Sequence, residues 1–440
     1  MDKDRILEKL GISQLNDMQR DTSDAILRSD KDVVVLSPTG SGKTLAYLLP
    51  LAECLDPQSD KLQAVVIVPG RELALQSCDV FKGMGTGLRA ACLYGGRVAM
   101  DEHRTLKKVR PQIVFATPGR FNDHIAKANI EPFAVRWLVI DEFDKCLRMG
   151  FQAEMEEALD NLPNVERRIL LSATEAEQIP SFVRMGRSAV VDYRDTTEQT
   201  PDRIGLFAVR SPEKDKLGAL KRLLCIFGND STIVFMNFRD GVERVTSYLR
   251  GEGFAVSEFH GGKEQRQREE ALYLFANGSA NVLVGTDLAS RGLDIPDVKN
   301  IVHYNLPVGQ DEYVHRVGRT GRWQDTGRAF FLLGPAEQVP EYVEGTVEPF
   351  DLPAPVDEIP QPRMATLYIG KGKKDKISKG DIVGFLCKNS GLNGSDIGRI
   401  DVYERYSYVA VSRQLAVEAI KGSSGQKIKG VKTVVEQIAV

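Results

Sequence analysis

The chain has no clustered cysteines and no long hydrophobic run. Its six cysteines lie far apart, without a C-x-x-C pair or a Cys/His cluster at metal-ligand spacing, so we expect reduced thiols and neither a disulfide framework nor a zinc site. No stretch approaches the roughly 18 apolar residues of a membrane-spanning helix, and the N-terminal stretch MDKDRILEKLGI lacks an apolar signal core. We therefore expect a cytoplasmic protein with no membrane partner.

The sequence also lacks an excess of charge and any low-complexity bias. A net charge of −3 argues against an indiscriminate binder of polyanions, and 42% hydrophobic with 27% charged residues is ordinary for a folded protein. The exception is residues 363–440, where fourteen Lys/Arg face seven Asp/Glu. This basic segment on an acidic remainder predicts a polyanionic partner for the segment.

Short apolar, β-branched runs recur with room for a helix between them. Runs of this kind are typical of parallel strands buried on both faces, so we expect an α/β fold with two similar domains in tandem. A chain of 440 residues is in any case too long for one hydrophobic core. The runs lie at 33–37, 64–69, 112–118, 137–142 and 169–174, and then at 232–238, 256–261, 281–287, 300–305 and 329–334.

The domain boundaries follow from the polar stretches between these runs. We place the first domain at residues 1–195 and the second at 206–334, joined by a polar linker. Prolines and acidic residues should keep the next segment, 335–362, extended and poorly packed. Residues 363–440 have the pattern of a small βαββαβ sandwich.

The stretch VVVLSPTGSGKT, residues 33–44, combines a buried strand, a loop of small residues and a helix start. Backbone N–H groups of such a loop can bind phosphate oxygens, while Lys43 supplies charge and the Thr44 hydroxyl can bind Mg²⁺. A Ser/Gly turn before a helix is the alternative interpretation. The candidate nucleotide-binding residues of this loop are Thr39, Gly40, Ser41, Gly42, Lys43 and Thr44.

Two acidic residues follow another buried strand, at the edge where open α/β sheets bind ligands. Asp141, with Thr44, is a candidate for holding Mg²⁺, and Glu142 for positioning and deprotonating an attacking water. The alternative is a solvated acidic pair at a strand end. The phosphate loop favours the catalytic interpretation.

The second domain contains VHRVGRTGR, residues 314–322, in which arginines alternate with glycines. Arginine is a permanent cation with a planar fork suited to phosphate, so Arg319 and Arg322 are candidates for stabilising charge on a transferring γ-phosphoryl group. Such a run can also be solvated or bind nucleic acid directly.

Taken in order, these motifs resemble those of the DEAD-box RNA helicases, superfamily 2, over nearly all of residues 1–335. The resemblance implies two RecA-like domains, ATP and Mg²⁺ as cofactors, and hydrolysis stimulated by RNA. It implies that Gln19 reads adenine, and that Asp294 contacts the nucleotide from the second domain. It further implies coupling roles for Asp144, Ser172 and Thr174, and an RNA track that includes Arg71, Gly96, Thr117, Arg120, Gly261, Thr286 and Arg291.

The chain departs from this family's pattern at four places. Phe143 replaces a small alanine in the DEFD tetrapeptide, and Asp144 must reach the SAT motif around it. Gly70 replaces a threonine, and Lys263 replaces an apolar residue. Residues 1–19 contain no aromatic ring to stack on adenine.

The basic C-terminal segment resembles the RNA-binding domain of DbpA-type bacterial helicases, through TLYIGKGKKDKISKGDIVGFL and GSDIGRIDVYERYSYVAV. The resemblance implies an RRM-like fold that docks on a hairpin of large-subunit ribosomal RNA. Tyr368 and Tyr408 are expected on one sheet face where bases could stack, although they could also be ordinary strand residues. Lys373, in a lysine cluster, is expected to contact phosphate rather than only water.

These observations predict a monomeric ATP-dependent RNA helicase that locally unwinds or remodels structured RNA, in particular ribosomal RNA during large-subunit assembly. An ATP-gated RNA clamp or assembly scaffold with little unwinding is the alternative. A DNA translocase is a third possibility, which the RNA-type motifs disfavour.

Overall fold

The structure is a computed structural model that describes residues 2–38, 40–95, 99–173, 179–194, 204–290, 298–321, 326–352 and 358–440. The described residues up to 194 form one compact unit, and those from 204 onwards form another. Among the described helices, none is both long enough and apolar enough to cross a membrane. All six cysteines are free thiols, as expected.

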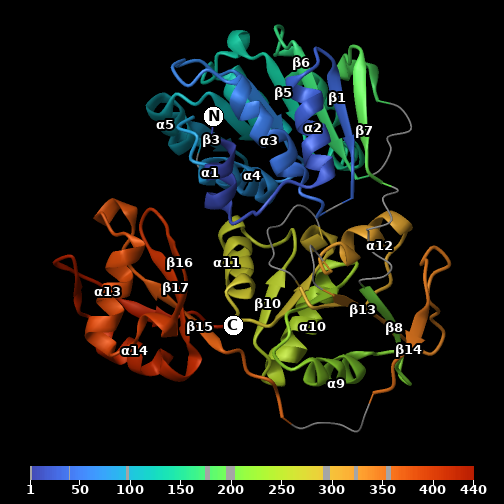
Figure 1. Ribbon diagram of the computed structural model, residues 1–440. Coiled ribbons are helices and arrows are strands. Elements are labelled where there is room, and N and C mark those ends of the chain that lie inside the picture. The colour runs from blue at the N-terminus through green and yellow to red at the C-terminus, as the bar shows by residue number, and fades with distance from the viewer. Residues whose placement is uncertain are drawn as a thin grey trace. The chain divides into compact units, whose positions relative to one another are not determined.

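A parallel sheet of seven strands forms the centre of the described part of the first unit (Figure 1), in the order β3-β4-β2-β5-β6-β1-β7. Five of these strands coincide with the apolar runs found in the sequence, which confirms the predicted α/β class. The strands are β1 Asp32–Leu36, β2 Ala64–Ile67, β3 Ala90–Leu93, β4 Ile113–Ala116, β5 Trp137–Ile140, β6 Arg167–Ser172 and β7 Ser188–Asp192.

Helices cover both faces of this sheet, which explains why its strands are apolar without alternation. In β2, Val66 packs in the core on one face, whereas Val65 and Ile67 pack in the core on the other. Helices α1 Lys3–Leu10, α2 Asp17–Leu27, α3 Lys43–Cys54 and α4 Arg71–Gly83 cover the first face. The opposite face carries α5 Ala99–Val109, α6 Pro118–Ala126, α7 Phe143–Arg148 and α8 Gln152–Asp160.

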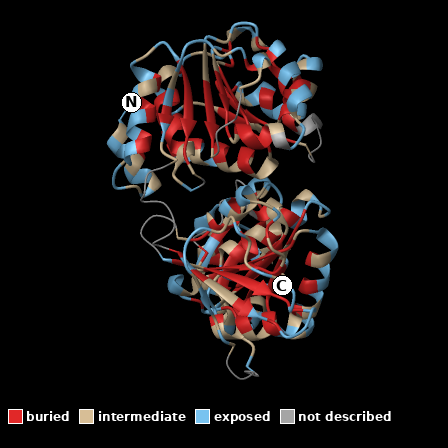
Figure 2. Ribbon diagram, turned by 90° about the vertical axis from the view of Figure 1, so that its right-hand side faces the viewer, coloured by how far each residue is buried: buried red, intermediate tan, exposed pale blue. Residues whose placement is uncertain are grey.

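The second unit repeats this plan with another parallel sheet, in the order β10-β11-β9-β12-β13-β8-β14 among its described residues. Its central strands are buried and the outer faces of its helices are exposed, as in the first sheet (Figure 2). The strands are β8 Ile204–Arg210, β9 Thr232–Phe235, β10 Val256–Phe259, β11 Val282–Gly285, β12 Asn300–His303, β13 Gly327–Leu333 and β14 Val347–Pro349. The helices are α9 Leu217–Phe227, α10 Arg239–Gly251, α11 Gln265–Ala276 and α12 Gln310–Val317.

The acidic segment after β13 makes specific contacts with the second sheet, although none of residues 335–352 is buried. Strand β14 pairs with β8, and the Phe350 ring meets Phe330 edge-on at 5.4 Å between centroids. Glu337 pairs with the buried Lys216 at 2.7 Å. Apolar residues spaced among the prolines supply enough buried surface to hold the segment on the sheet.

The C-terminal segment forms an antiparallel sheet in the order β16-β17-β15-β20, with two helices on one face. This arrangement confirms the predicted βαββαβ order. Leu367 and Val409 point toward Phe385 of α13 and Ala419 of α14. The elements are β15 Met364–Ile369, α13 Lys379–Ser390, β16 Ile397–Val402, β17 Ser407–Ser412, α14 Ala416–Ser423 and β20 Val435–Gln437, with a small hairpin of β18 Lys427–Ile428 and β19 Val431–Lys432.

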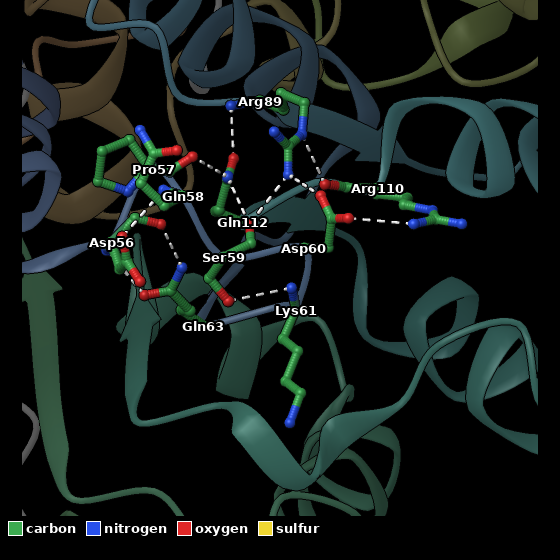
Figure 3. A network of polar contacts seen from close by, with 10 residues as sticks. All are labelled: Asp56, Pro57, Gln58, Ser59, Asp60, Lys61, Gln63, Arg89, Arg110 and Gln112. Atoms are coloured by element: carbon green, nitrogen blue, oxygen red, sulfur yellow. Dashed lines mark hydrogen bonds and ion pairs between the residues drawn. The ribbon is translucent and has the colours of Figure 1, made fainter.

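A polar network closes the amino-terminal edge of the first sheet (Figure 3). The buried Gln112 side chain accepts a hydrogen bond from the Arg89 N–H at 2.7 Å and donates to the carbonyl oxygens of Pro57 (3.1 Å) and Ser59 (2.7 Å). Arg89 and Arg110 both pair with Asp60. One amide thus satisfies three backbone groups where β3 and β4 begin.

We expect Gln112→Leu to lower the free energy of unfolding by about 2 kcal/mol, because it removes the acceptor of the Arg89 N–H and buries an apolar side chain among polar groups, while the Ser59 carbonyl keeps the Arg89 Nη2 as a donor. Denaturant unfolding of the full-length protein measures this loss. Gln58→Leu, in the same loop but at an exposed side chain, is the control and should change stability by less than about 0.5 kcal/mol. Equal effects of the two variants would contradict the role assigned to Gln112.

Candidate functional site

The strands of the first sheet are parallel, so their carboxyl ends meet at one edge, and the predicted site residues follow those ends. The phosphate loop follows β1, Arg71 follows β2, Thr117 follows β4, and Asp141 and Glu142 follow β5. Ser172 ends β6, and its carbonyl oxygen accepts a hydrogen bond from the Ser37 N–H at 3.0 Å. Thr39, Gly96 and Thr174 lie outside the described residues.

The phosphate loop is wound tightly around the Lys43 side chain. Gly40 and Gly42 have φ angles of 87° and 86°, a region that favours glycine, and Gly42 caps α3. The Lys43 Nζ donates to the carbonyl oxygens of Ser37 (2.5 Å) and Pro38 (2.6 Å). Burial lowers the pKa of Lys43 to about 8, against the opposing charges of Asp141 and Glu142.

Helix α2 braces this loop from outside. The Gln19 Nε2 donates to the carbonyl oxygen of Gly42 at 3.2 Å, and the Asn16 Nδ2 donates to that of Ser41 at 3.0 Å. A Cβ on Gly42 would lie 2.4 Å from the Gln19 Nε2 and would displace this amide, and the φ of 86° is strained for other residues. The Gln19 Oε1 accepts from the Asn16 N–H at 3.0 Å. Sequence reasoning missed Asn16, although the N-x-x-Q pattern of a capping box signals it.

Of the acidic pair, Asp141 is buried and Glu142 is half-buried, and both charges act on Lys43. The Asp141 Oδ1 accepts from the Glu142 N–H at 2.9 Å, and burial, reinforced by the charge of Glu142, raises the pKa of Asp141 to about 7. Glu142 has a φ of 53°, a strained conformation for this residue type. Its Oε1 pairs with the buried Lys145 Nζ at 2.6 Å. Lys145 is a site residue that sequence reasoning missed.

A buried carboxylate at this edge, on a strand end beside a phosphate loop, fits a divalent cation. The raised pKa of Asp141 means that nearby positive charge does not fully offset the cost of burying its negative form. Oxygen ligands are those that Mg²⁺ prefers, and Thr44 stands in the first turn of α3.

The aromatic residue of DEFD is a core residue. Phe143 is 1% exposed and packs in the cluster that contains Ile140, Cys146 and Met155, so its ring points away from the strand-end edge. Asp144 is also buried. The extra bulk at position 143 is therefore accommodated inside the first unit.

Two arginines of the predicted RNA track lie in different environments. Arg71 begins α4, and its guanidinium lies against Gly95, where a Cβ would be 3.4 Å from Nη2. Arg120 is largely buried and bonds to the Glu102 Oε2 at 2.6 Å, which His124 also contacts at 2.9 Å. Glu102 carries no motif in the sequence, so this buried triad was not predicted.

In the second unit, Gly261 and Thr286 line one open groove of about 610 Å³ at the carboxyl ends of β9, β10 and β11. Arg319 is buried. Arg291, Asp294 and Arg322 lie outside the described residues. Arg316 is fully buried and bonds to Asp287 and Asn237, so it supports the fold around this groove.

The sheet face of the C-terminal segment that carries Tyr408 is covered by α11 of the same unit. Tyr408 is 2% exposed; its ring lies 5.3 Å from Tyr273, and its hydroxyl donates to Glu270 at 2.6 Å. The Tyr273 hydroxyl donates to the Arg399 carbonyl at 2.8 Å. The prediction that Tyr408 is free to stack on bases is therefore wrong in this structure, because a protein helix takes that place. Tyr368 is half-buried.

The comparisons with known proteins agree with this geometry. Family models match at residues 16–181 (DEAD/DEAH box helicase), 215–324 (helicase conserved C-terminal domain) and 366–437 (DbpA RNA binding domain). The chain is 36% identical over 434 residues to the ATP-dependent RNA helicase DbpA of Escherichia coli, covering 96% of this chain and 94% of that protein. The chain belongs to the DEAD-box ATP-dependent RNA helicases of the DbpA type. DbpA of Bacillus subtilis is 30% identical over 458 residues, covering 97% of this chain and 95% of that protein.

Solved helicase structures match the two parallel sheets. Mss116p bound to single-stranded RNA and AMP-PNP aligns with a TM-score of 0.69 and 26% identity, covering 76% of this chain and 73% of that chain. Dbp5 of S. cerevisiae, bound to RNA and ADP BeF3, aligns with a TM-score of 0.68 and 24% identity, covering 75% and 87%. The fold of tandem RecA-like domains is thereby confirmed, and ATP and RNA are the ligands of this helicase family.

In this DEAD-box helicase, Phe143 should act as a core residue. We expect Phe143→Ala to lower the free energy of unfolding by about 3 kcal/mol, because it leaves a cavity in a closed apolar cluster. Thermal denaturation of the full-length protein tests this expectation. The control, Phe133→Ala, removes a ring that is 69% exposed and should be nearly neutral. A near-neutral Phe143→Ala would contradict the packing role.

Proposed function

We propose that the protein uses ATP to separate or remodel structured RNA locally, and that its substrate is ribosomal RNA during large-subunit assembly. The observation that carries the enzymatic part is the juxtaposition of Lys43 with the buried Asp141 and the half-buried Glu142 at the end of the phosphate loop. The match of the C-terminal segment to the DbpA RNA binding domain supports the choice of RNA.

The site residues take distinct roles in this proposal. The phosphate loop and Lys43 bind the triphosphate. Gln19 reads adenine, and its side-chain amide is hydrogen-bonded to the Gly42 carbonyl. Glu142, oriented by Lys145, positions the attacking water and accepts its proton. Asp294, Arg319 and Arg322 act on the nucleotide from the second RecA-like domain. Asp144, Ser172 and Thr174 couple hydrolysis to the RNA track, which comprises Arg71, Gly96, Thr117, Arg120, Gly261, Thr286 and Arg291.

Thr44 and Asp141 would hold Mg²⁺ in this site. The ion supplies positive charge against the phosphate oxygens when it is bound. Asp141 fits this role because its carboxylate is buried with one oxygen fixed by the Glu142 N–H.

We expect Glu142→Gln to reduce RNA-stimulated ATP hydrolysis by about 100-fold or more, because the amide cannot accept a proton. Binding of AMP-PNP should persist, since the loop is untouched. Steady-state hydrolysis with and without structured RNA measures the effect, and Glu131→Gln, at an exposed side chain in the same domain, is the control. Unchanged turnover in Glu142→Gln would refute the assignment, and wild-type hydrolysis that ignores RNA would refute the proposed coupling.

Strand displacement separates a helicase from a clamp. A short duplex placed beside a bound hairpin should be released by the wild-type protein with ATP and Mg²⁺, but not with AMP-PNP alone. Stable ATP-dependent RNA binding without release would favour the clamp or scaffold.

Lysines of the C-terminal segment supply the RNA-docking surface in this proposal. Lys373 and Lys374 are exposed, and the Lys429 Nζ donates to the Lys376 carbonyl at 2.9 Å, so two basic loops lie side by side. The buried Tyr408 leaves these loops, rather than the helix-covered sheet face, as the supported contact for a hairpin.

We expect Lys373→Ala with Lys374→Ala to weaken binding of structured RNA and to reduce the slope of log K against log salt by about 1 to 2 units. Fluorescence anisotropy across a salt series measures both quantities. Lys388→Ala, an exposed lysine of α13, and Tyr408→Phe should leave the slope unchanged. An unchanged slope in the double lysine variant would contradict the assignment of the docking surface to these loops.

A further inference from the structure

The groove at the carboxyl ends of β9, β10 and β11 contains a residue that the site description has not used. Phe238 is 76% exposed and lines the groove together with Arg239 and the two residues of the predicted RNA track, Gly261 and Thr286. A single exposed apolar residue is unremarkable on a surface. In the proposed function this groove binds RNA, so a nucleobase is available as a ligand for the Phe238 ring.

The backbone that carries Phe238 is held rigidly. Its neighbour Asn237 accepts from the buried Arg316 Nη2 at 2.8 Å and donates to the Leu306 carbonyl at 3.1 Å. The Asn237 N–H donates to the Asn305 Oδ1 at 3.2 Å. Phe238 then caps α10, so its position is fixed from both sides before any ligand arrives.

Two adjacent glycines, Gly261 and Gly262, also line the groove, and Gly261 leaves space for a ligand. A Cβ added to Gly261 would meet nothing within 4 Å, whereas one on Gly262 would lie 3.0 Å from the His260 Nδ1. The His260 Nε2 contacts Glu258 at 3.0 Å, and its Nδ1 accepts from the Gly262 N–H at 3.2 Å, so the ring orients the glycine turn. An exposed ring and an uncrowded glycine in the lining of one groove leave room for a flat ligand.

A metal ion is a poorer fit to this part of the molecule. Glu243, Glu258 and His260 have ligand atoms close to one another, but the Lys263 Nζ already pairs with Glu258 at 3.0 Å. That cation compensates the buried carboxylate, and His260 is engaged by the turn. The groove itself offers Arg239 for phosphate and Phe238 for an aromatic face, with Asp240 paired to Arg239.

We propose that Phe238 stacks on a nucleobase of the single-stranded RNA bound in this groove. The proposal rests on the proposed function and adds a base contact to it. Phenylalanine has no hydrogen-bonding group, so the contact reads the presence of a base and not its identity. It gives the second domain a sequence-tolerant hold on one nucleotide.

A double-mutant cycle tests the stacking directly. Full-length protein is titrated, with AMP-PNP and Mg²⁺, into fluorescein-labelled single-stranded oligouridines in which one abasic site is moved along the strand. Phe238→Ala should weaken binding of intact RNA by about 5- to 100-fold. For the wild type, one abasic position should cause a similar loss, and that position should cause no further loss in Phe238→Ala.

Two more variants complete the experiment. Phe238→Trp should restore affinity, and its emission should be quenched when RNA binds, whereas Val308→Ala, at a side chain 79% exposed and outside the groove lining, should behave as wild type. Wild-type affinity of Phe238→Ala, or abasic losses that add fully in that variant, would overturn the proposal. If the stacking proposal fails in this way but RNA still stimulates hydrolysis by the wild type, the proposed function stands. Wild-type hydrolysis that does not respond to RNA would refute the proposed function itself.

Discussion

Parallel strands buried on both faces are apolar along most of their length, and this constraint shapes both larger domains. The centres of β1, β2, β4, β5 and β6 are apolar, so most charged side chains lie at the strand ends or just beyond them. Right-handed parallel connections bring all carboxyl ends to one edge. The phosphate loop, the acidic pair and Arg71 are far apart in the sequence. They lie at the same edge of the sheet because each follows the end of a parallel strand.

The charges collected at this edge are buried or half-buried and close together, which makes them interdependent. Lys43 is held by its own loop, Asp141 by the next backbone N–H, and Glu142 by Lys145. Removing one partner would leave another charge uncompensated in a poorly solvated place. The proposed nucleotide site is thus a single electrostatic unit. Gln19 connects it to α2 through the hydrogen bond to the Gly42 carbonyl.

Much of the fold could be predicted from the sequence, because fully buried strands have a composition that short loops do not mimic. Strands β7 and β14 were not identified from the sequence. They lie at the edges of their sheets, where a strand pairs with only one neighbour and a short or partly polar sequence is sufficient. The motif residues could be identified from the sequence because phosphate binding and proton transfer each require particular residue types. Lys145, Glu102 and Asn16 were missed because they act through partners that only the folded chain brings near. Tyr408 was misjudged since a sheet face that suits bases also suits a helix.

The contact between α11 and the C-terminal sheet has a consequence for how RNA reaches the groove. Asn277 bonds to Thr366 at 2.8 Å and Arg413 to the Ser279 carbonyl at 3.1 Å, in addition to the tyrosine contacts, so the basic loops and the groove belong to one body. In the proposed function, an RNA held by the loops is no longer a freely diffusing substrate. Its flanking strand then samples a small volume around the groove, and its effective concentration there depends on the length and stiffness of the intervening RNA rather than on the amount in solution. Under the same proposal, the spacing between anchor and target sets which helix is opened.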